Sequence, residues 1–102
     1  QTEKNIYSFG PVTLDSEKHI VTVDGEVCHL TVKEFELLRY LLVNTDIVLK
    51  REQIMEAVWG FTYEGESRTI DMHIKSLRQK LGDGGHIIRT VRGVGYVIGG
   101  NI

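Results

Sequence analysis

The chain has 102 residues, 41% of them hydrophobic and only one a proline, and its formal net charge is −2. This composition suits one folded domain with one core and excludes a disordered chain. No apolar run approaches the roughly 18 residues that cross a membrane, and the polar Gln1–Asn5 segment lacks a signal-peptide stretch. We therefore expect a single domain over residues 1–102, ordered over about 6–98.

The first 30 residues predict a small antiparallel sheet. Apolar residues flank the turn signal Gly10-Pro11. The β-branched run His19–Val23 is followed by Asp24-Gly25, a strong hairpin turn, and the chain returns over Glu26–Leu30.

Thr31 begins the first predicted helix. Thr31 and Glu34 have the spacing of a capping box, in which each side chain accepts a hydrogen bond from the other residue's backbone. Phe35, Leu38 and Leu42 recur at helical spacing, and the helix should end near residues 44–46. Residues 47–49 are expected to form a short apolar link.

A second helix is predicted over Arg51–Trp59, with Gly60 able to end it. A third helix is predicted over Ser67–Leu81, since Ser67 is a good N-cap and glycines follow Leu81. The end of the chain predicts a hairpin, with strands over residues 87–91 and 96–98. Gly93 and Gly95 are expected to supply positive φ in its turn.

The third helix has two different faces. Its apolar stripe should pack on the core and comprises Ile70, Ile74, Leu77 and Leu81. The opposite face carries cations, hydrogen-bonding groups and a methionine but no acid, and comprises Arg68, Thr69, Met72, Lys75, Ser76 and Gln79. A major groove about 12 Å wide accepts such a helix, because Arg, Lys and Gln read base edges. A solvated surface with a stray methionine is the alternative.

The charge is unevenly distributed. Residues 1–67 hold six Lys/Arg and twelve Asp/Glu, a net charge of −6, whereas residues 68–102 hold six Lys/Arg and two acids, a net charge of +4. A basic C-terminal third on an acidic body suggests a face that attracts phosphate. A helix-turn-helix followed by a hairpin wing is a known plan for docking on DNA.

Four motifs in order resemble the effector domain of the OmpR/PhoB family of bacterial two-component response regulators. They are Leu30–Leu38, Arg51–Ile54 with Val58–Gly60, Ser67–Ile74 with Leu77-Arg78, and Thr90–Tyr96. The resemblance implies an α+β winged helix-turn-helix fold, with a four-stranded N-terminal antiparallel sheet, three helices and a C-terminal β-hairpin wing. It implies sequence-specific binding of double-stranded DNA and transcription regulation within a phosphorelay.

The resemblance also assigns roles to residues. Helix 67–81 would lie in the major groove, and wing 90–96 would meet the minor groove or backbone. Together with the outward face of the helix, the expected DNA-binding residues are Trp59, Arg68, Thr69, Met72, His73, Lys75, Ser76, Arg78, Gln79, Thr90, Arg92 and Gly93. The loop Phe61, Thr62, Tyr63, Glu64, Gly65 and Glu66 corresponds to the segment that meets RNA polymerase in family activators.

Two residues depart from the family pattern. Ser76 stands where some relatives carry Arg, and Lys50 replaces the usual Ser/Thr cap of the second helix. The phosphoacceptor receiver domain, which a sensor kinase would address, is not in this chain. We expect a monomer when free and a head-to-tail dimer on promoter direct repeats.

Two other functional classes compete with DNA binding. An enzyme is disfavoured, because Cys28 and His29 would point to opposite faces of a strand and His73 has no His or Cys one helical turn away. No catalytic residue, metal or cofactor is therefore expected. With Cys28 alone no internal disulfide can form, which is compatible with the cytoplasm. A winged-helix module that binds acidic protein is the second alternative. Asp71 is expected to pair with a nearby cation, such as Arg68.

Overall fold

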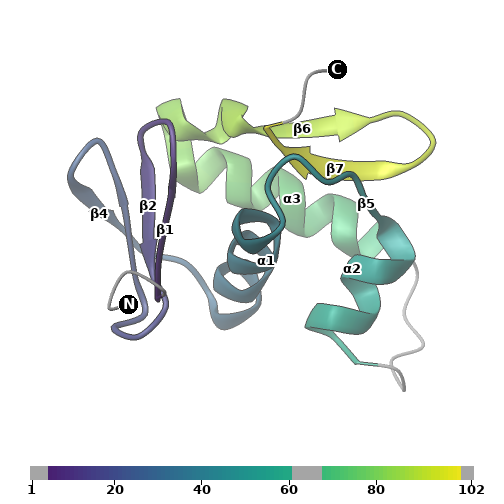
Figure 1. Ribbon diagram of the computed structural model, residues 1–102, viewed down its shortest axis with the longest axis horizontal. Helices are drawn as coiled ribbons and strands as arrows, with labels where there is room; N and C mark the ends of the chain where they lie inside the picture. The colour runs from purple at the N-terminus through teal and green to yellow at the C-terminus, as the bar shows by residue number, and fades with distance from the viewer. Residues whose placement is uncertain (1–4, 61–67, 100–102) are drawn as a thin grey trace.

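The computed structural model describes residues 5–60 and 68–99, with the backbone alone at residues 68 and 69 (Figure 1). Its elements in chain order are β1 (Ile6–Phe9), β2 (Val12–Asp15), β3 (Ile20–Val23), β4 (Glu26–Cys28), α1 (Val32–Val43), β5 (Leu49–Lys50), α2 (Arg51–Val58), α3 (Arg68–Leu81), the 3-10 helix η2 (Gly82–Ile87), β6 (Ile88–Val91) and β7 (Gly95–Ile98). The expected α+β architecture, with an N-terminal sheet, three helices and a C-terminal hairpin, is confirmed.

The N-terminal sheet is a four-stranded antiparallel meander in the order β1-β2-β3-β4. Leu14 lies between Tyr7 and Val21 in the register, and Val12, Leu14 and Val21 are all buried. Because side chains alternate across a strand, these residues form one apolar face. The sheet stands at one end of the molecule, beside α1 (Figure 1).

Helix α1 begins at the predicted capping box. The Thr31 hydroxyl accepts the backbone N–H of Glu34 at 3.2 Å, and Glu34 Oε1 accepts the backbone N–H of Thr31 at 2.9 Å. Phe35, Leu38 and Leu42 are buried as expected. The helix ends at Val43 with Asn44 as its C-cap, close to the end predicted near residues 44–46.

Helix α2 begins without a side-chain cap from Lys50. The Lys50 backbone N–H instead donates to Gln53 Oε1 at 2.9 Å. Residues 47–49 were expected to form a short apolar link, but Leu49 and Lys50 form the short strand β5, which pairs with β7. The sequence analysis missed this strand because its partner, β7, lies more than 40 residues later in the chain, and such pairing leaves no local pattern.

Helix α3 lies across the helical layer and supplies much of the core. Its predicted stripe of Ile70, Ile74, Leu77 and Leu81 is buried, together with Leu37, Leu38 and Leu41 of α1. The chain was expected simply to stop being helical at Gly82. It continues instead as η2, which brings the chain round to β6.

The second sheet has the order β5-β7-β6, and its β6-β7 hairpin projects beyond the helices (Figure 1). Gly93 has φ +76 in the turn, as predicted. Gly95 does not have positive φ, so that expectation is wrong. A Cβ on Gly95 would overlap the carbonyl oxygen of Leu49, and the glycine therefore permits close approach of β5 to β7.

Candidate nucleic-acid interface

The outward face of α3 is exposed at three positions. Met72 keeps 69% of its surface accessible, and Lys75 and Gln79 are also exposed. These three positions lie opposite the buried Ile70–Leu81 stripe, as the helical periodicity predicted. The side chains of Arg68 and Thr69, two more expected contacts, lie outside the described residues. We call Met72, Lys75 and Gln79 the crest.

On one flank of the crest, α3 is tied to the start of α1. Ser76 Oγ donates to Glu34 Oε2 at 2.6 Å, and Lys80 Nζ donates to Glu34 Oε1 at 2.8 Å. Glu34 retains only 3% of its surface. Ser76 was expected to face outward, but it is half-buried and directed to this carboxylate. The long sequence separation hid the contact from local pattern analysis.

The Glu34 carboxylate is ionised throughout the physiological pH range. Burial alone would raise its pKa, but hydrogen bonds from Lys80, Ser76 and the Thr31 backbone outweigh that effect and lower the pKa to about 2. The capping box predicted from the sequence is thus half of a larger arrangement, in which one carboxylate caps α1 and holds α3.

On the opposite flank, Arg78 ties α3 to the wing. Its Nε and one terminal nitrogen donate to the carbonyl oxygen of Ile88 at 3.2 and 2.8 Å, and the same terminal nitrogen donates to Thr90 Oγ1 at 2.8 Å. The guanidinium also lies 5.8 Å from the centre of the Tyr96 ring. Two expected DNA contacts, Arg78 and Thr90, are therefore joined to each other.

A second link on this flank involves Asp71. Arg51 Nε donates to Asp71 Oδ1 at 3.1 Å, and the Tyr96 hydroxyl donates to the same oxygen. Burial works to raise the pKa of Asp71, but these two hydrogen bonds leave it below its ordinary value. Among the described side chains, Asp71 thus pairs with Arg51, 20 residues away. Arg68, the suggested partner, has no described side chain.

Trp59 lies where α2 meets α3. Its ring packs on the core and makes an edge contact with His73, with centroids 5.0 Å apart. Lys33 Nζ donates to the Val58 carbonyl oxygen at 2.8 Å and lies 5.8 Å from the centre of the Trp59 ring. Trp59 is therefore partly core, as expected, and the structure brings it beside His73.

The wing tip is open. Arg92, Gly93 and Val94 are exposed, and Val94 N–H donates to the Val91 carbonyl oxygen at 3.0 Å to close the turn. This places a cation at the end of a narrow, glycine-containing loop. A tip of this shape can enter a groove too narrow for a helix.

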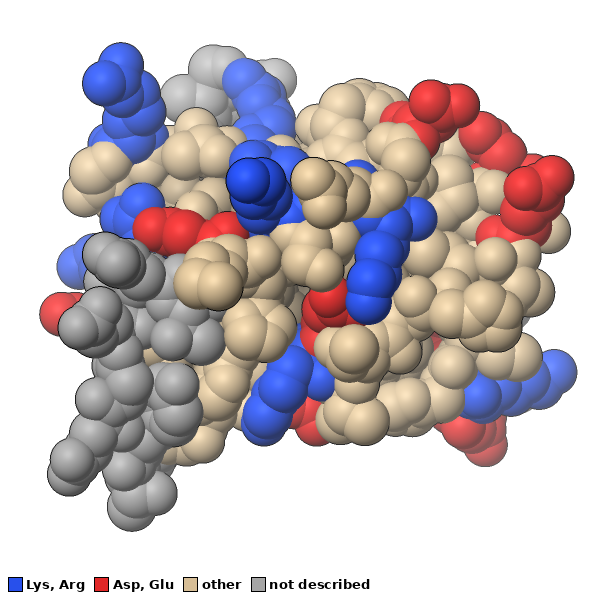
Figure 2. Space-filling view, turned by 180° about the vertical axis from the view of Figure 1, so that it is seen from behind, with Lys and Arg blue, Asp and Glu red and all other residues tan. Residues whose placement is uncertain are grey.

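Figure 2 views the molecule from the side on which α3 lies and shows how its charges are arranged. Blue Lys and Arg side chains are spread across the middle and left of this face. A group of red carboxylates lies at its upper right edge. Carboxylates also occur between the cations, and a further cation lies at the lower right edge (Figure 2).

Over residues 5–60 and 68–99, no three His, Cys, Asp or Glu side chains are grouped to hold a metal ion. Within the same part of the chain, no helix has the length and apolar character to cross a membrane. The expected polymerase-contact segment, residues 61–66, lies outside the described residues.

Comparisons with known proteins agree with this geometry. The family model described as "Transcriptional regulatory protein, C terminal" matches residues 24–98. The sensory transduction protein RegX3 of Mycolicibacterium smegmatis is 42% identical over 102 residues, which covers 96% of this chain and 44% of that protein. The chain thus spans less than half of this relative.

Two solved structures show the same fold. Response regulator DrrB of Thermotoga maritima, described as an OmpR/PhoB homologue, superposes with a TM-score of 0.85 at 33% identity, over 95% of this chain and 45% of that one. The RstA DNA-binding domain of Klebsiella pneumoniae, solved in complex with the RstA box, gives a TM-score of 0.81 at 31% identity, over 92% of this chain and 96% of that one.

Proposed function

The chain belongs to the OmpR/PhoB family of response regulators as a C-terminal winged-helix effector domain, and we propose that it binds duplex DNA with the crest of α3 in the major groove and the wing tip at the minor groove. The observation that carries this proposal is the exposed crest of Met72, Lys75 and Gln79 on a helix whose two flanks are tied to the rest of the domain. A rigidly held helix presents its side chains to bases in one register.

The chemistry of the crest suits base edges. Lys75 can donate to guanine O6 or N7, Gln79 can pair with adenine, and Met72 can contact a thymine methyl. Arg68 and Thr69 at the start of α3 complete the proposed base-facing set. The order of these base-facing residues along α3 determines which base pairs each of them reaches. Sequence preference would therefore depend on these residues.

Phosphate contacts would position the helix. Thr90 accepts a hydrogen bond from Arg78, which leaves the threonine's own proton for donation to a phosphate oxygen. Trp59 and His73 lie together on the opposite side of the crest, where the indole N–H and imidazole can approach the other strand. Arg92 and Gly93 form the wing contact, with Arg92 supplying the charge.

Charge reversal tests this interface. Lys75→Glu and Arg92→Glu should each weaken duplex binding at least tenfold, because each turns an attraction to phosphate or bases into repulsion. Lys18→Glu changes the charge equally on an exposed turn of the N-terminal sheet and should leave affinity nearly unchanged. If all three variants bind as the wild type does in a fluorescence-anisotropy titration, the proposed interface is wrong.

The remaining partners follow from the family. We propose that this domain acts in the cytoplasm in a phosphorelay, under a receiver domain that a sensor kinase phosphorylates, and that residues 61–66 contact RNA polymerase. A single module of this size buries roughly 600–1,000 Å² on DNA and binds weakly. Monomers in solution would therefore pair head to tail on direct repeats, where effective concentration raises avidity.

A further inference from the structure

We infer that the buried carboxylate of Glu34 withdraws Lys80 and Ser76 from DNA, so that Lys80 neutralises Glu34 instead of a phosphate and Ser76 takes no part in base recognition. This inference rests on the proposed function, since it concerns which residues of α3 take part in it. It assigns Glu34 the role of a positioning residue that limits the contact surface of the helix.

Lys80 is the C-terminal cation of α3 and retains 39% of its side-chain surface, so exposure alone would make it a candidate phosphate ligand. Its ammonium lies 2.8 Å from Glu34 Oε1, and the Glu34 side chain keeps only 4% of its surface. If Lys80 swung out to a phosphate, Glu34 would remain as a buried charge without its cation. Leaving a buried carboxylate without its cation is unfavourable, so the contact with Glu34 opposes movement of Lys80 to DNA.

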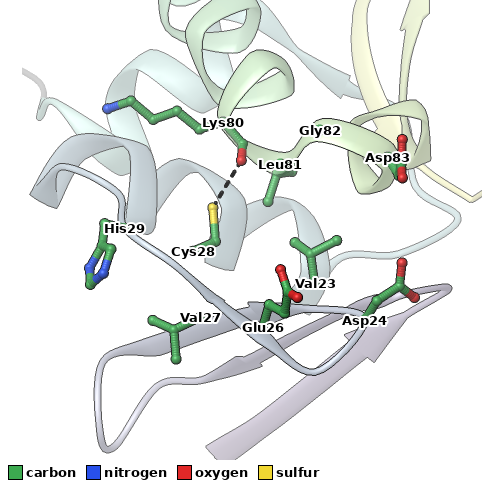
Figure 3. A pocket seen from close by; sticks show the side chains of 10 residues that line it. All are labelled: Val23, Asp24, Glu26, Val27, Cys28, His29, Lys80, Leu81, Gly82 and Asp83. Atoms are coloured by element: carbon green, nitrogen blue, oxygen red, sulfur yellow. Dashed lines mark hydrogen bonds between the residues drawn. The ribbon is translucent and has the colours of Figure 1, made fainter.

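The backbone at Lys80 is held as well. Cys28 Sγ donates to the Lys80 carbonyl oxygen at 3.1 Å, which joins β4 to the last turn of α3. In Figure 3 the Lys80 side chain extends away from the carboxylates of Asp24, Glu26 and Asp83, which line the same pocket. The direction of Lys80 therefore follows its contact with Glu34 and not attraction to the acidic edge of the pocket.

Ser76 is bound to the same carboxylate from one turn earlier on α3. Its hydroxyl proton is committed to Glu34 Oε2 at 2.6 Å. Ser76 and Lys80 are four residues apart and share the flank of α3 that faces α1. This carboxylate thus holds α3 from the flank opposite to Arg78 and Asp71, and it supports the rotation in which the buried stripe faces the core and Met72, Lys75 and Gln79 stand at the crest.

The test measures how binding to a random-sequence duplex depends on salt, because each phosphate that a cation neutralises changes the log–log slope by about 0.9. Glu34→Gln keeps the shape of the side chain but removes its charge and releases Lys80. The slope should become more negative by about 0.9, which corresponds to one additional neutralised phosphate. Affinity for random duplex should rise several-fold at low salt. The ratio of affinity for a specific duplex, selected from a random library, to affinity for random duplex should fall.

Three further variants make the result specific. Glu34→Gln with Lys80→Met removes both charges together and should return the slope to the wild-type value. Glu17→Gln removes the same charge from an exposed turn of the N-terminal sheet and should leave the slope unchanged. Arg92→Met removes the charge of the proposed wing contact and should make the slope shallower by about 0.9.

Each outcome decides one question. If Arg92→Met makes the slope shallower but Glu34→Gln leaves it at the wild-type value, Lys80 is already on DNA or never reaches it, and the inference is overturned while the proposed function stands. If Arg92→Met leaves the slope unchanged, the proposed wing contact fails, and with it the proposed docking on DNA. Thermal melts accompany every variant; should Glu34→Gln not fold, Lys80→Met in the wild-type background must keep the wild-type slope for the inference to survive.

Discussion

Arg78 of α3 donates a hydrogen bond of 2.8 Å to the hydroxyl of Thr90 in the wing. The same guanidinium donates twice to the Ile88 carbonyl oxygen. The helix and the hairpin proposed to enter adjacent grooves are thus fixed to each other by one side chain. The spacing between α3 and the hairpin is therefore already set in the domain before it binds DNA.

Arg78→Lys should loosen this link. A lysine keeps the charge but lacks the planar set of donors that reaches both oxygens. We expect the free energy of unfolding to fall by about 1–3 kcal/mol, the usual cost of leaving a hydrogen-bonded group unsatisfied. Urea denaturation measures it, with Arg39→Lys on the exposed face of α1 as the matched control. Equal stability of the two variants would show that the link carries little energy.

The two wing glycines should respond differently to alanine. At Gly93, with φ +76 and no atom within 4 Å of an added Cβ, the strain of a left-handed backbone should cost about 1–2 kcal/mol. At Gly95 the new Cβ overlaps the Leu49 backbone, so β5 and β7 must separate. Gly95→Ala should therefore lower the melting temperature clearly more than Gly93→Ala. The reverse order would show that the wing does not need its pairing with β5.

Stability should depend on acid pH through Glu34. Its pKa is about 2 in the folded protein, below the ordinary value of 4.5. A lowered pKa stabilises the fold at pH values above 4.5, and this contribution is lost as pH falls toward 2. The free energy at stake is on the order of 2–3 kcal/mol.

Urea titrations of wild type and Glu34→Gln between pH 7 and pH 3 test this prediction. The stability gap between them should narrow as the pH falls below about 4.5, because Glu34 of the unfolded wild type then binds a proton that the folded state excludes until about pH 2, whereas the variant has no such group. A gap that stays constant across this range would mean that the Glu34 charge is not what holds α1 to α3.

Binding to DNA should depend steeply on salt. With about four to six phosphates neutralised per domain, the log–log slope of affinity against salt concentration should be roughly −4 to −5. Titrations between low and physiological salt measure this slope directly. A slope near zero would reject electrostatic docking, whatever the affinity.

Local patterns predicted most of this fold. Helix α1 could be located because Thr31 and Glu34 form the capping box at short spacing, and α3 because its apolar residues recur with helical period. Contacts between distant residues could not be predicted in this way. The bonds from Ser76 and Lys80 to Glu34 span 42 and 46 residues, and nothing in the α1 sequence signals which α3 side chains will meet that carboxylate.

The same limit explains the errors at the wing. Gly95 looked like a turn residue because it follows Gly93 by two positions, but its requirement comes from β5, which lies far away in the chain. Asp71 was expected to pair with a nearby cation, such as Arg68, and local spacing could not indicate that it also accepts from Arg51 of α2 and Tyr96 of β7. Local spacing located helix α3, whereas its contacts with Glu34 and Arg51 join residues 20 or more positions apart.

The most direct test of sequence-specific DNA recognition is selection from a random duplex library with the purified domain at low salt, followed by sequencing. We predict enrichment of a short motif, occurring as direct repeats about one helical turn apart, and loss of that enrichment with Lys75→Glu. Recovery of no enriched motif by the folded wild-type domain would contradict the proposed base readout by α3.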